Sequence, residues 1–155
     1  MGTLKYFLTD AVKPKETVHQ LYFIGAFLQE KVKNKVFVNF ECRYADHFPL
    51  YSSYFGRALR LLKYMYGMTN SRKLFADELT EWFIEQGFIR SQCQMSIYYK
   101  CALDGTNIVV LYYVDDCVYW YTSKDLGKWL VETIENKVHV KFLGYSNWFM
   151  SIRIS

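Results

Sequence analysis

Two adjacent carboxylates, Asp115 and Asp116, stand between two strongly apolar runs, residues 108–114 and 117–121. Neighbouring carboxylates repel each other, and burial beside apolar strands makes both charges costly unless a cation or hydrogen-bond donors compensate them. Mg²⁺ prefers oxygen ligands and commonly binds one or two carboxylates together with substrate phosphates. The pair therefore predicts a metal-dependent phosphoryl or nucleotidyl transfer site. Two solvated aspartates on a hairpin turn are the alternative that the pair alone leaves open.

Basic residues gather between positions 57 and 73 and alternate with aromatic residues. The basic members are Arg57, Arg60, Lys63, Arg72 and Lys73, and the aromatic members are Tyr54, Phe55, Tyr64 and Tyr66. Cations that pair with phosphates, and rings that stack on bases, are the usual means of holding a nucleic-acid strand. An ordinary solvated surface has the same composition, so both interpretations stay open.

The four cysteines form no Cys-x2-Cys pair. Cys42 and His47 have no two further ligands nearby, and Cys93 and Cys101 lack the spacing of a zinc site. Cys117 follows the acidic pair and is best read as a small strand residue, since no histidine is close to it in sequence. We therefore expect reduced thiols, as in intracellular proteins.

The acidic pair needs a framework, and the apolar pattern predicts one. Apolar positions with helical spacing predict a helix over residues 72–86, which Gly87 ends. The turn at residues 103–106 joins the apolar runs 96–99 and 108–114 in a hairpin, and the acidic pair lies at the head of a second hairpin. Ser123 predicts the start of a helix that reaches Asn136.

The remaining pattern predicts further strands and one more helix. A helix is expected over residues 4–12, and strands are expected over 17–23, 31–40, 138–142 and 148–154. Residues 31–40 alternate in polarity, as a half-buried strand does. This order of helices, strands and hairpins favours the α+β class over a strict βαβ alternation.

The composition is that of a folded chain. Of the 155 residues 52% are hydrophobic and 22% are charged, which fits a single domain over residues 1–155 and excludes disorder. No apolar run approaches the roughly 18 residues of a membrane span, and residues 1–8 are too short for a signal peptide. We expect an intracellular protein with no membrane partner, in cytoplasm or nucleus. The net charge of +4 permits a nucleic-acid partner without requiring one.

Tyr113, Val114, Asp115 and Asp116 spell YVDD, and this segment resembles the active-site hairpin of reverse transcriptases. Further blocks, in the family's order between about residue 4 and residue 154, resemble the copia-type retrotransposon branch in particular. The blocks are His19 and Gln20 with residues 26–28, residues 36–38, LLKYMYGM at 61–68, Lys73 with Phe75, GF and RS within residues 87–91, and residues 143–144 with 148–152.

This resemblance implies the palm of a right-hand polymerase with part of the fingers, an antiparallel sheet backed by helices. The chain would be a fragment without the thumb, ribonuclease H and integrase. The implied activity is RNA-directed DNA polymerisation by two-metal nucleotidyl transfer, with Asp115 and Asp116 as catalytic ligands of two Mg²⁺ or Mn²⁺ ions. The implied partners are an RNA template, a DNA primer, deoxynucleoside triphosphates and the remainder of a Pol polyprotein. The residues expected near template and nucleotide are Gly67, Arg72, Lys73, Tyr113 and Val114.

Tyr22 departs from the family pattern, because it stands where the first catalytic Asp, the third metal ligand, is expected. A neutral phenol is a poor Mg²⁺ ligand, and its ring would fill space that a metal and a triphosphate need. Neither Asp10 nor Glu16 has the strand position to replace it. We therefore expect an impaired polymerase; a non-catalytic nucleic-acid-binding palm and a decayed element relic are the alternatives. Arg72 stands where the family usually has Pro, which leaves the shape of the loop at 67–71 open.

Overall fold

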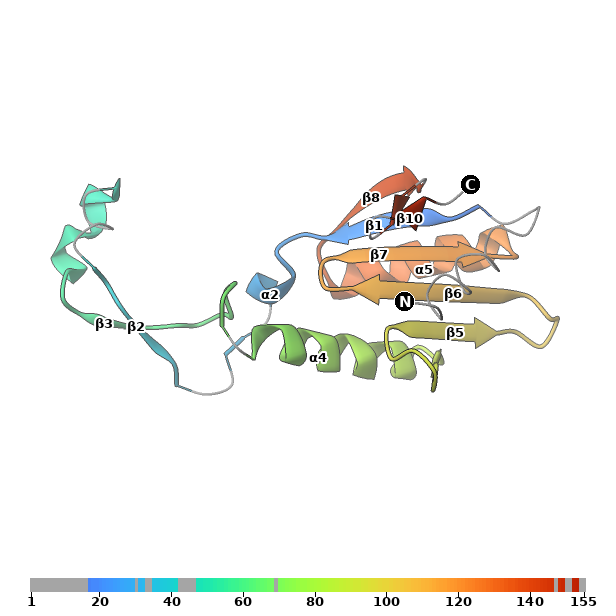
Figure 1. Cartoon of the computed structure of the whole chain (residues 1–155), viewed down its shortest axis with the longest axis horizontal. Helices are drawn as coiled ribbons and strands as arrows, with labels where there is room; N and C mark the ends of the chain where they lie inside the picture. Colours follow the sequence, from blue (N-terminus) through green and yellow to red (C-terminus); the bar gives the residue numbers. More distant parts are fainter. Residues whose placement is uncertain are drawn as a thin grey trace.

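The computed structural model describes residues 17–29, 31–32, 35–41, 47–68, 70–146, 148–149 and 152–153. Its centre is a six-stranded antiparallel sheet with the strand order β4-β5-β6-β7-β1-β8 (Figure 1). The strands are β4 (Ile89–Arg90), β5 (Ile97–Cys101), β6 (Asn107–Tyr113), β7 (Asp116–Tyr121), β1 (His19–Phe23) and β8 (Val140–Tyr145). The first strand of the chain therefore lies inside the sheet, between two strands from its second half.

Two helices, α4 (Ser71–Glu85) and α5 (Lys124–Lys137), cover one face of this sheet. Phe75 and Phe83 of α4 and Leu130 of α5 are buried in the core on that face. The helix predicted over residues 72–86 is confirmed within one residue at each end, and Gly87 follows it with φ +81°. A left-handed residue after the last turn is a common way to end a helix, and glycine adopts it without strain.

The opposite face of the sheet holds a second cluster of buried side chains. Leu111 and Trp120 lie there with Phe149 of β9 (Trp148–Phe149), which pairs with β10 (Ile152–Arg153). Because successive strand residues point to opposite faces, strands covered on both sides read as continuous apolar runs. This explains the uninterrupted apolar character of residues 108–114 and 117–121.

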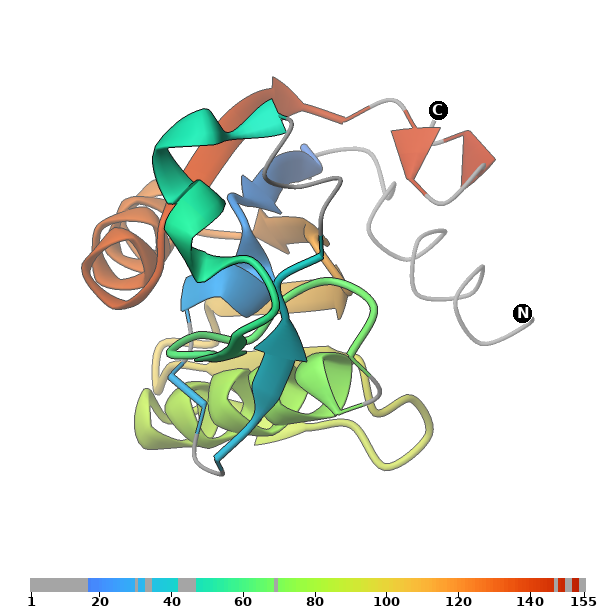
Figure 2. The same cartoon turned by 90° about the vertical axis from the view of Figure 1, so that its left-hand side faces the viewer.

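A hairpin arm extends from the helix-covered sheet on the side of the β6–β7 turn (Figures 1 and 2). It consists of β2 (Phe37–Asn39), β3 (Ala58–Arg60) and the 3-10 helix η1 (Pro49–Tyr54), and an antiparallel bridge between Lys31 and Lys63 pairs the two ends of the arm at its base. The exposed, half-buried strand expected over residues 31–40 is confirmed only as a short strand: β2 has three residues, and all three are exposed, so the expected buried side is wrong. Among the described residues its strand partner is β3.

Several other predicted elements are confirmed with shifted bounds. Both hairpins are present, and the strand expected at 138–142 is β8 at Val140–Tyr145. The single strand expected over residues 148–154 is wrong: the described residues there are the two short strands β9 and β10, which pair with each other. Ser123 is the N-cap of α5, but its hydroxyl makes no capping hydrogen bond; its backbone carbonyl accepts from Gly127 N at 3.2 Å.

Two further expectations concern the N-terminal residues and membrane-spanning helices. The helix expected over residues 4–12 falls outside the described residues. No helix within the described part of the chain is long and apolar enough to cross a membrane.

Candidate active site

The acidic pair lies where β6 turns into β7, with Asp115 in the turn and Asp116 as the first residue of β7. This end of the sheet faces α2 (Ala26–Gln29) and the arm (Figure 1). Tyr113 pairs with Asp116, so the turn itself consists of Val114 and Asp115. Val114 has φ +59°, the only non-glycine residue with positive φ among the described residues. A β-branched side chain is strained there, and such strain is characteristic of functional sites.

Asp115 is held by one main-chain and one side-chain contact, from two different segments. Its backbone carbonyl accepts from Phe23 N at 2.8 Å, which fixes the turn against the end of β1. The Tyr66 hydroxyl donates to Asp115 Oδ2 at 3.2 Å. The other carboxylate oxygen, Oδ1, is buried and has no hydrogen-bond partner within the described structure. The carboxylate is thus precisely placed but only partly compensated.

The electrostatics of Asp115 follow from this environment. Burial raises the pKa of Asp115 above its usual range, the hydrogen bond from Tyr66 opposes the increase, and the charge of Asp116 adds to it. The charge of Arg72 is close enough to lower the pKa slightly. Because its negative charge is only partly compensated, the Asp115 carboxylate could bind a further cation.

Tyr22 lies beside the acidic pair, because β1 is the neighbour of β7. In the β1–β7 register Tyr22 is directly opposite Asp116, whose partner on the other side is Tyr113. Burial raises the pKa of Tyr66 to about 12, and the charge of Asp115 and the Tyr22 phenol contribute to the increase. The side chains of Tyr22, Tyr66 and Asp115 therefore form one cluster.

A cavity of about 350 Å³ opens next to this turn. Its lining brings together Arg72, Lys73, Tyr113 and Val114, four of the five residues expected near a nucleotide. Phe27 and Phe75 supply apolar walls. Gly67, the fifth, is exposed, has φ +89° and does not line the cavity.

The basic and aromatic cluster is divided between the arm and the start of α4. Arg57 and Arg60 are exposed on the arm, and the guanidinium of Arg57 lies 5.9 Å from the ring centre of Tyr54. Arg72 and Lys73 are exposed at the first turn of α4. Tyr64 is buried in the core, so its ring is not part of an exposed stacking surface.

A model of the reverse transcriptase (RNA-dependent DNA polymerase) family matches residues 1–155, the whole of the chain. The chain belongs to the reverse transcriptase family. The matching branch is the copia-type one, as the YVDD segment and its accompanying blocks suggested. No curated protein and no solved structure matches the chain. Membership in the reverse transcriptase family implies nucleic-acid and nucleotide substrates.

The site of this reverse transcriptase family member fits a divalent cation only in part. The buried, unpartnered Oδ1 of Asp115 and the neighbouring Asp116 offer hard oxygen ligands of the kind that Mg²⁺ and Mn²⁺ prefer. No group of three or more His, Cys, Asp or Glu side chains capable of holding a metal occurs among the described residues, and position 22 contributes a phenol. Two carboxylates fit one cation completed by water or phosphate oxygens, whereas a two-ion site needs more negative charge.

The thiols make no metal site in the described structure. Cys93, Cys101 and Cys117 are free cysteines, and burial raises the pKa of the Cys117 thiol. Cys117 is fully enclosed in the core as a small strand residue. His47 is exposed, and Cys42 falls outside the described residues.

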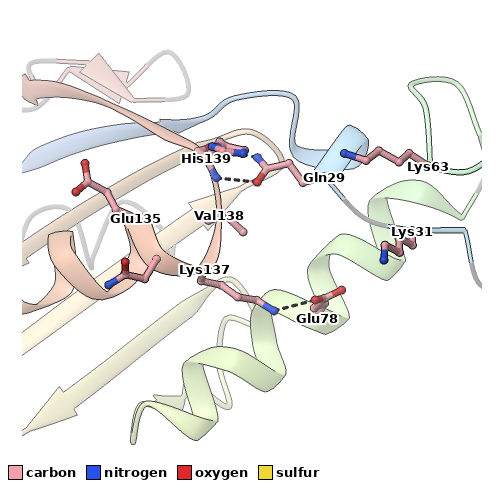
Figure 3. A pocket seen from close by; sticks show the side chains of 9 residues that line it. Gln29, Lys31, Lys63, Glu78, Glu135, Lys137, Val138 and His139 are labelled. Atoms are coloured by element: carbon pink, nitrogen blue, oxygen red, sulfur yellow. Dashed lines mark hydrogen bonds and ion pairs between the residues drawn. The ribbon is translucent and has the colours of Figure 1, made fainter.

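A second, larger cavity of about 520 Å³ lies between the helices and the base of the arm (Figure 3). Lys137 Nζ donates to Glu78 Oε1 at 2.8 Å across it, and the backbone N–H of His139 donates to Gln29 Oε1 at 2.7 Å. Lys31 and Lys63 line it from the arm side. Lysines and glutamates both contribute to its wall, and α5 ends there, so its charge favours no single class of ligand.

Sequence reasoning located the acidic pair and position 22 but missed one contact, that of Tyr66 with Asp115. The sequence places Tyr66 among the aromatic residues of the basic cluster and in the block at 61–68, without a role of its own. The sequence offers a weak signal, since Gly67 follows Tyr66 and permits a sharp change of chain direction there. The contact itself cannot be read from the sequence, because Tyr66 and Asp115 are separated by 49 in residue number.

Proposed function

We propose that this chain is the palm, with part of the fingers, of a copia-type reverse transcriptase, as a single-domain fragment of a Pol polyprotein. Its activity would be RNA-directed DNA polymerisation, impaired because Tyr22 replaces the first catalytic Asp. The observation that carries the proposal is the register that sets Tyr22 opposite Asp116, with Asp115 at the adjoining turn. The position expected for a third carboxylate is therefore next to the other two, and it is occupied by a phenol.

In this mechanism the residues of the chain bind and orient the reactants. Asp115 and Asp116 would hold Mg²⁺ or Mn²⁺, which supplies activation of the primer hydroxyl and stabilisation of the phosphate charge. Arg72 and Lys73 lie at the cavity beside the acidic turn and suit the phosphates of a nucleotide by charge. Tyr113 and Val114 would shape the side of the cavity nearest the carboxylates.

The phenol impairs the reaction for two reasons. It supplies no negative charge at neutral pH, so two carboxylates face the positive charge of two cations. Its ring also occupies volume beside Asp116, where a cation and phosphate oxygens would have to fit. Replacement of Tyr22 by Asp corrects both defects at once.

Primer extension on an RNA template tests the proposal, with the unchanged chain compared with Tyr22→Asp. We expect the revertant to extend the primer at least about a hundredfold faster, the scale on which metal-site defects act. Tyr51→Asp is the matched control: it adds the same carboxylate to the exposed arm and should restore nothing. Asp116→Asn in the revertant should abolish extension. A rate in the unchanged chain within tenfold of that of the revertant would contradict the claim of impairment.

A non-catalytic role in nucleic-acid binding is the second candidate, and the arm favours it. Leu50, Tyr51 and Phe55 are 92%, 54% and 57% exposed, and Arg57 and Arg60 are exposed on the same arm. Exposed rings among cations suit the bases and phosphates of a nucleic-acid strand. This function would need no metal ion and would survive the loss of the third carboxylate.

A further inference from the structure

We propose that the Tyr66 hydroxyl competes with a divalent cation for Oδ2 of Asp115, so that the Tyr66–Asp115 hydrogen bond weakens cation binding there. This inference rests on the proposed cation site at Asp115 and Asp116. It assigns Tyr66 a role that the family resemblance does not contain, that of a positioning residue which holds the carboxylate in the metal-free state.

The two oxygens of Asp115 differ in accessibility. Oδ1 is buried and unpartnered, whereas Oδ2 accepts the hydroxyl of Tyr66 at 3.2 Å. A carboxylate oxygen that accepts a hydrogen bond has fewer lone pairs free for a metal. A cation that uses both oxygens competes with the hydroxyl for the electron density of Oδ2, and one that uses Oδ1 alone must reach a shielded atom.

The Tyr66 ring is held in place by a ring contact with Phe27 and by a hydrogen bond that fixes the adjacent backbone. Its centre lies 4.7 Å from that of Phe27, at a tilt of 55°. The turn that carries Tyr66 is fixed by the buried Ser71, whose hydroxyl donates to the carbonyl oxygen of Met65 at 2.9 Å. The hydroxyl therefore reaches Asp115 from a supported ring and not from a freely rotating side chain.

Tyr22 and Tyr66 act differently in this arrangement. Tyr22 withholds a ligand, and only a carboxylate at that position corrects the defect. Tyr66 blocks a ligand that is present, and removal of a single hydroxyl is enough to release it. The substitutions Tyr22→Asp and Tyr66→Phe should therefore each strengthen cation binding, but because the two side chains lie in one cluster their fold-changes should not simply multiply.

The test measures Mn²⁺ binding to the intact chain without nucleic acid, by the electron paramagnetic resonance signal of free Mn²⁺. Tyr66→Phe keeps the ring and its packing on Phe27 while it removes the donor. We expect it to bind Mn²⁺ about tenfold more tightly than the unchanged chain, the ratio that one hydrogen bond to a charged group is worth. Tyr145→Phe, which removes a hydroxyl from an exposed side chain of β8, should leave the affinity unchanged.

A second measurement leaves Tyr66 in place. With 3-fluorotyrosine at position 66, addition of Mg²⁺ should shift its fluorine resonance, because the hydroxyl loses its acceptor. In Asp115→Asn the shift should disappear. Equal Mn²⁺ affinity of Tyr66→Phe and the unchanged chain, or a fluorine resonance that Mg²⁺ does not move, would overturn the proposal.

The result can be separated from that of the proposed function. Tighter Mn²⁺ binding by Tyr66→Phe supports the competition even if Tyr22→Asp extends no primer. Primer extension by Tyr22→Asp together with unchanged Mn²⁺ affinity of Tyr66→Phe supports the polymerase and rejects the competition.

Discussion

Asp115 carries a charge that the folded chain compensates only in part. Burial raises its pKa in the folded state, so the folded chain keeps a proton on Asp115 at pH values where the unfolded chain has released it. The free energy of unfolding therefore falls as pH rises from the unfolded pKa, near 3.8, through the raised folded value. The full destabilisation is present once the pH exceeds the raised folded pKa.

Asp115→Asn should accordingly make the chain more stable at pH 7, by roughly 1 kcal/mol, as substitutions at strained functional sites often do. The amide keeps the shape of the side chain and can still accept the Tyr66 hydroxyl at its oxygen. Thermal unfolding across pH checks this: the gain should shrink as pH falls through the raised folded pKa of Asp115 and should vanish below the unfolded pKa near 3.8, where Asp115 is protonated in both states.

Asp104→Asn provides a control of opposite sign. The side-chain hydrogen bond from Thr106 lowers the pKa of Asp104, so its contribution to stability is present above the unfolded pKa and is lost as pH falls. This variant should gain no stability at pH 7. An Asp115→Asn variant that is less stable than the unchanged chain at pH 7 would contradict the assignment of a strained charge.

At the residue scale, the sequence was sufficient to predict the site residues that a local motif marks. Two adjacent carboxylates between apolar runs, and Tyr22 where an Asp was expected, are visible in the chain as letters, and the fold places them side by side. That they bind metal stays a prediction. The burial of Asp115 Oδ1 and its contact with Tyr66 depend on the packing of segments far apart in sequence, which no local pattern encodes.

At the scale of a single element, helix α5 contains Gly127 at a position where the neighbouring Tyr121 ring leaves no room for a larger side chain. A Cβ atom at Gly127 would lie 2.4 Å from Cε1 of the Tyr121 ring, closer than any real contact. Helix propensity alone would favour Ala over Gly by about 1 kcal/mol. The close approach of the helix to β7 outweighs that preference.

Gly127→Ala should therefore destabilise the chain, by roughly 1–3 kcal/mol, the usual cost of overpacking. Urea denaturation measures the difference. Lys128→Ala, an exposed position on the same helix, is the matched control and should change stability by less than about 0.5 kcal/mol. Equal stability of Gly127→Ala and the unchanged chain would mean that the Tyr121 ring moves aside freely.

Predictions of helices and strands were correct where the apolar periodicity and a terminating residue agreed. They were wrong where the sequence pattern did not show which strand would pair with the predicted one. The helix at α4 had both a buried stripe and a glycine terminator, and it is found as predicted. The alternation over residues 31–40 indicated a strand but not which strand would pair with it. Because β2 pairs only with β3 in the arm, its alternation does not separate a core face from a solvent face.

At the scale of the whole molecule, we propose that the sheet with its helices carries the metal site and that the arm binds nucleic acid. The acidic pair lies at the end of the sheet, and the arm extends beyond that end (Figure 1). The arm carries exposed rings and cations. Binding of a nucleic-acid duplex between the sheet and the arm should depend on salt, because each phosphate contact releases counterions. The membership in the reverse transcriptase family leads to this expectation.

The paired substitution Arg57→Gln with Arg60→Gln should weaken binding of an RNA–DNA duplex and reduce the salt dependence, log Kd against log salt, by about 2. Fluorescence anisotropy over a salt series measures both. Lys124→Gln with Lys128→Gln removes the same charge from exposed positions on α5 and should have little effect. No binding by the unchanged chain at low salt would reject the nucleic-acid-binding role and leave a decayed relic as the remaining interpretation.

The position of β1 inside the sheet has a consequence for biosynthesis. Residues 19–23 leave the ribosome before either of their neighbours, since β7 ends at Tyr121 and β8 at Tyr145. Until then both edges of this apolar strand lack partners, and pairings of such long sequence separation form slowly. The acidic turn, which Phe23 anchors, can therefore form only after Asp115 has been synthesised, 92 residues after Phe23. Until then the nascent chain exposes an unpaired strand that is open to aggregation, and chaperone binding to residues 19–23 would protect it.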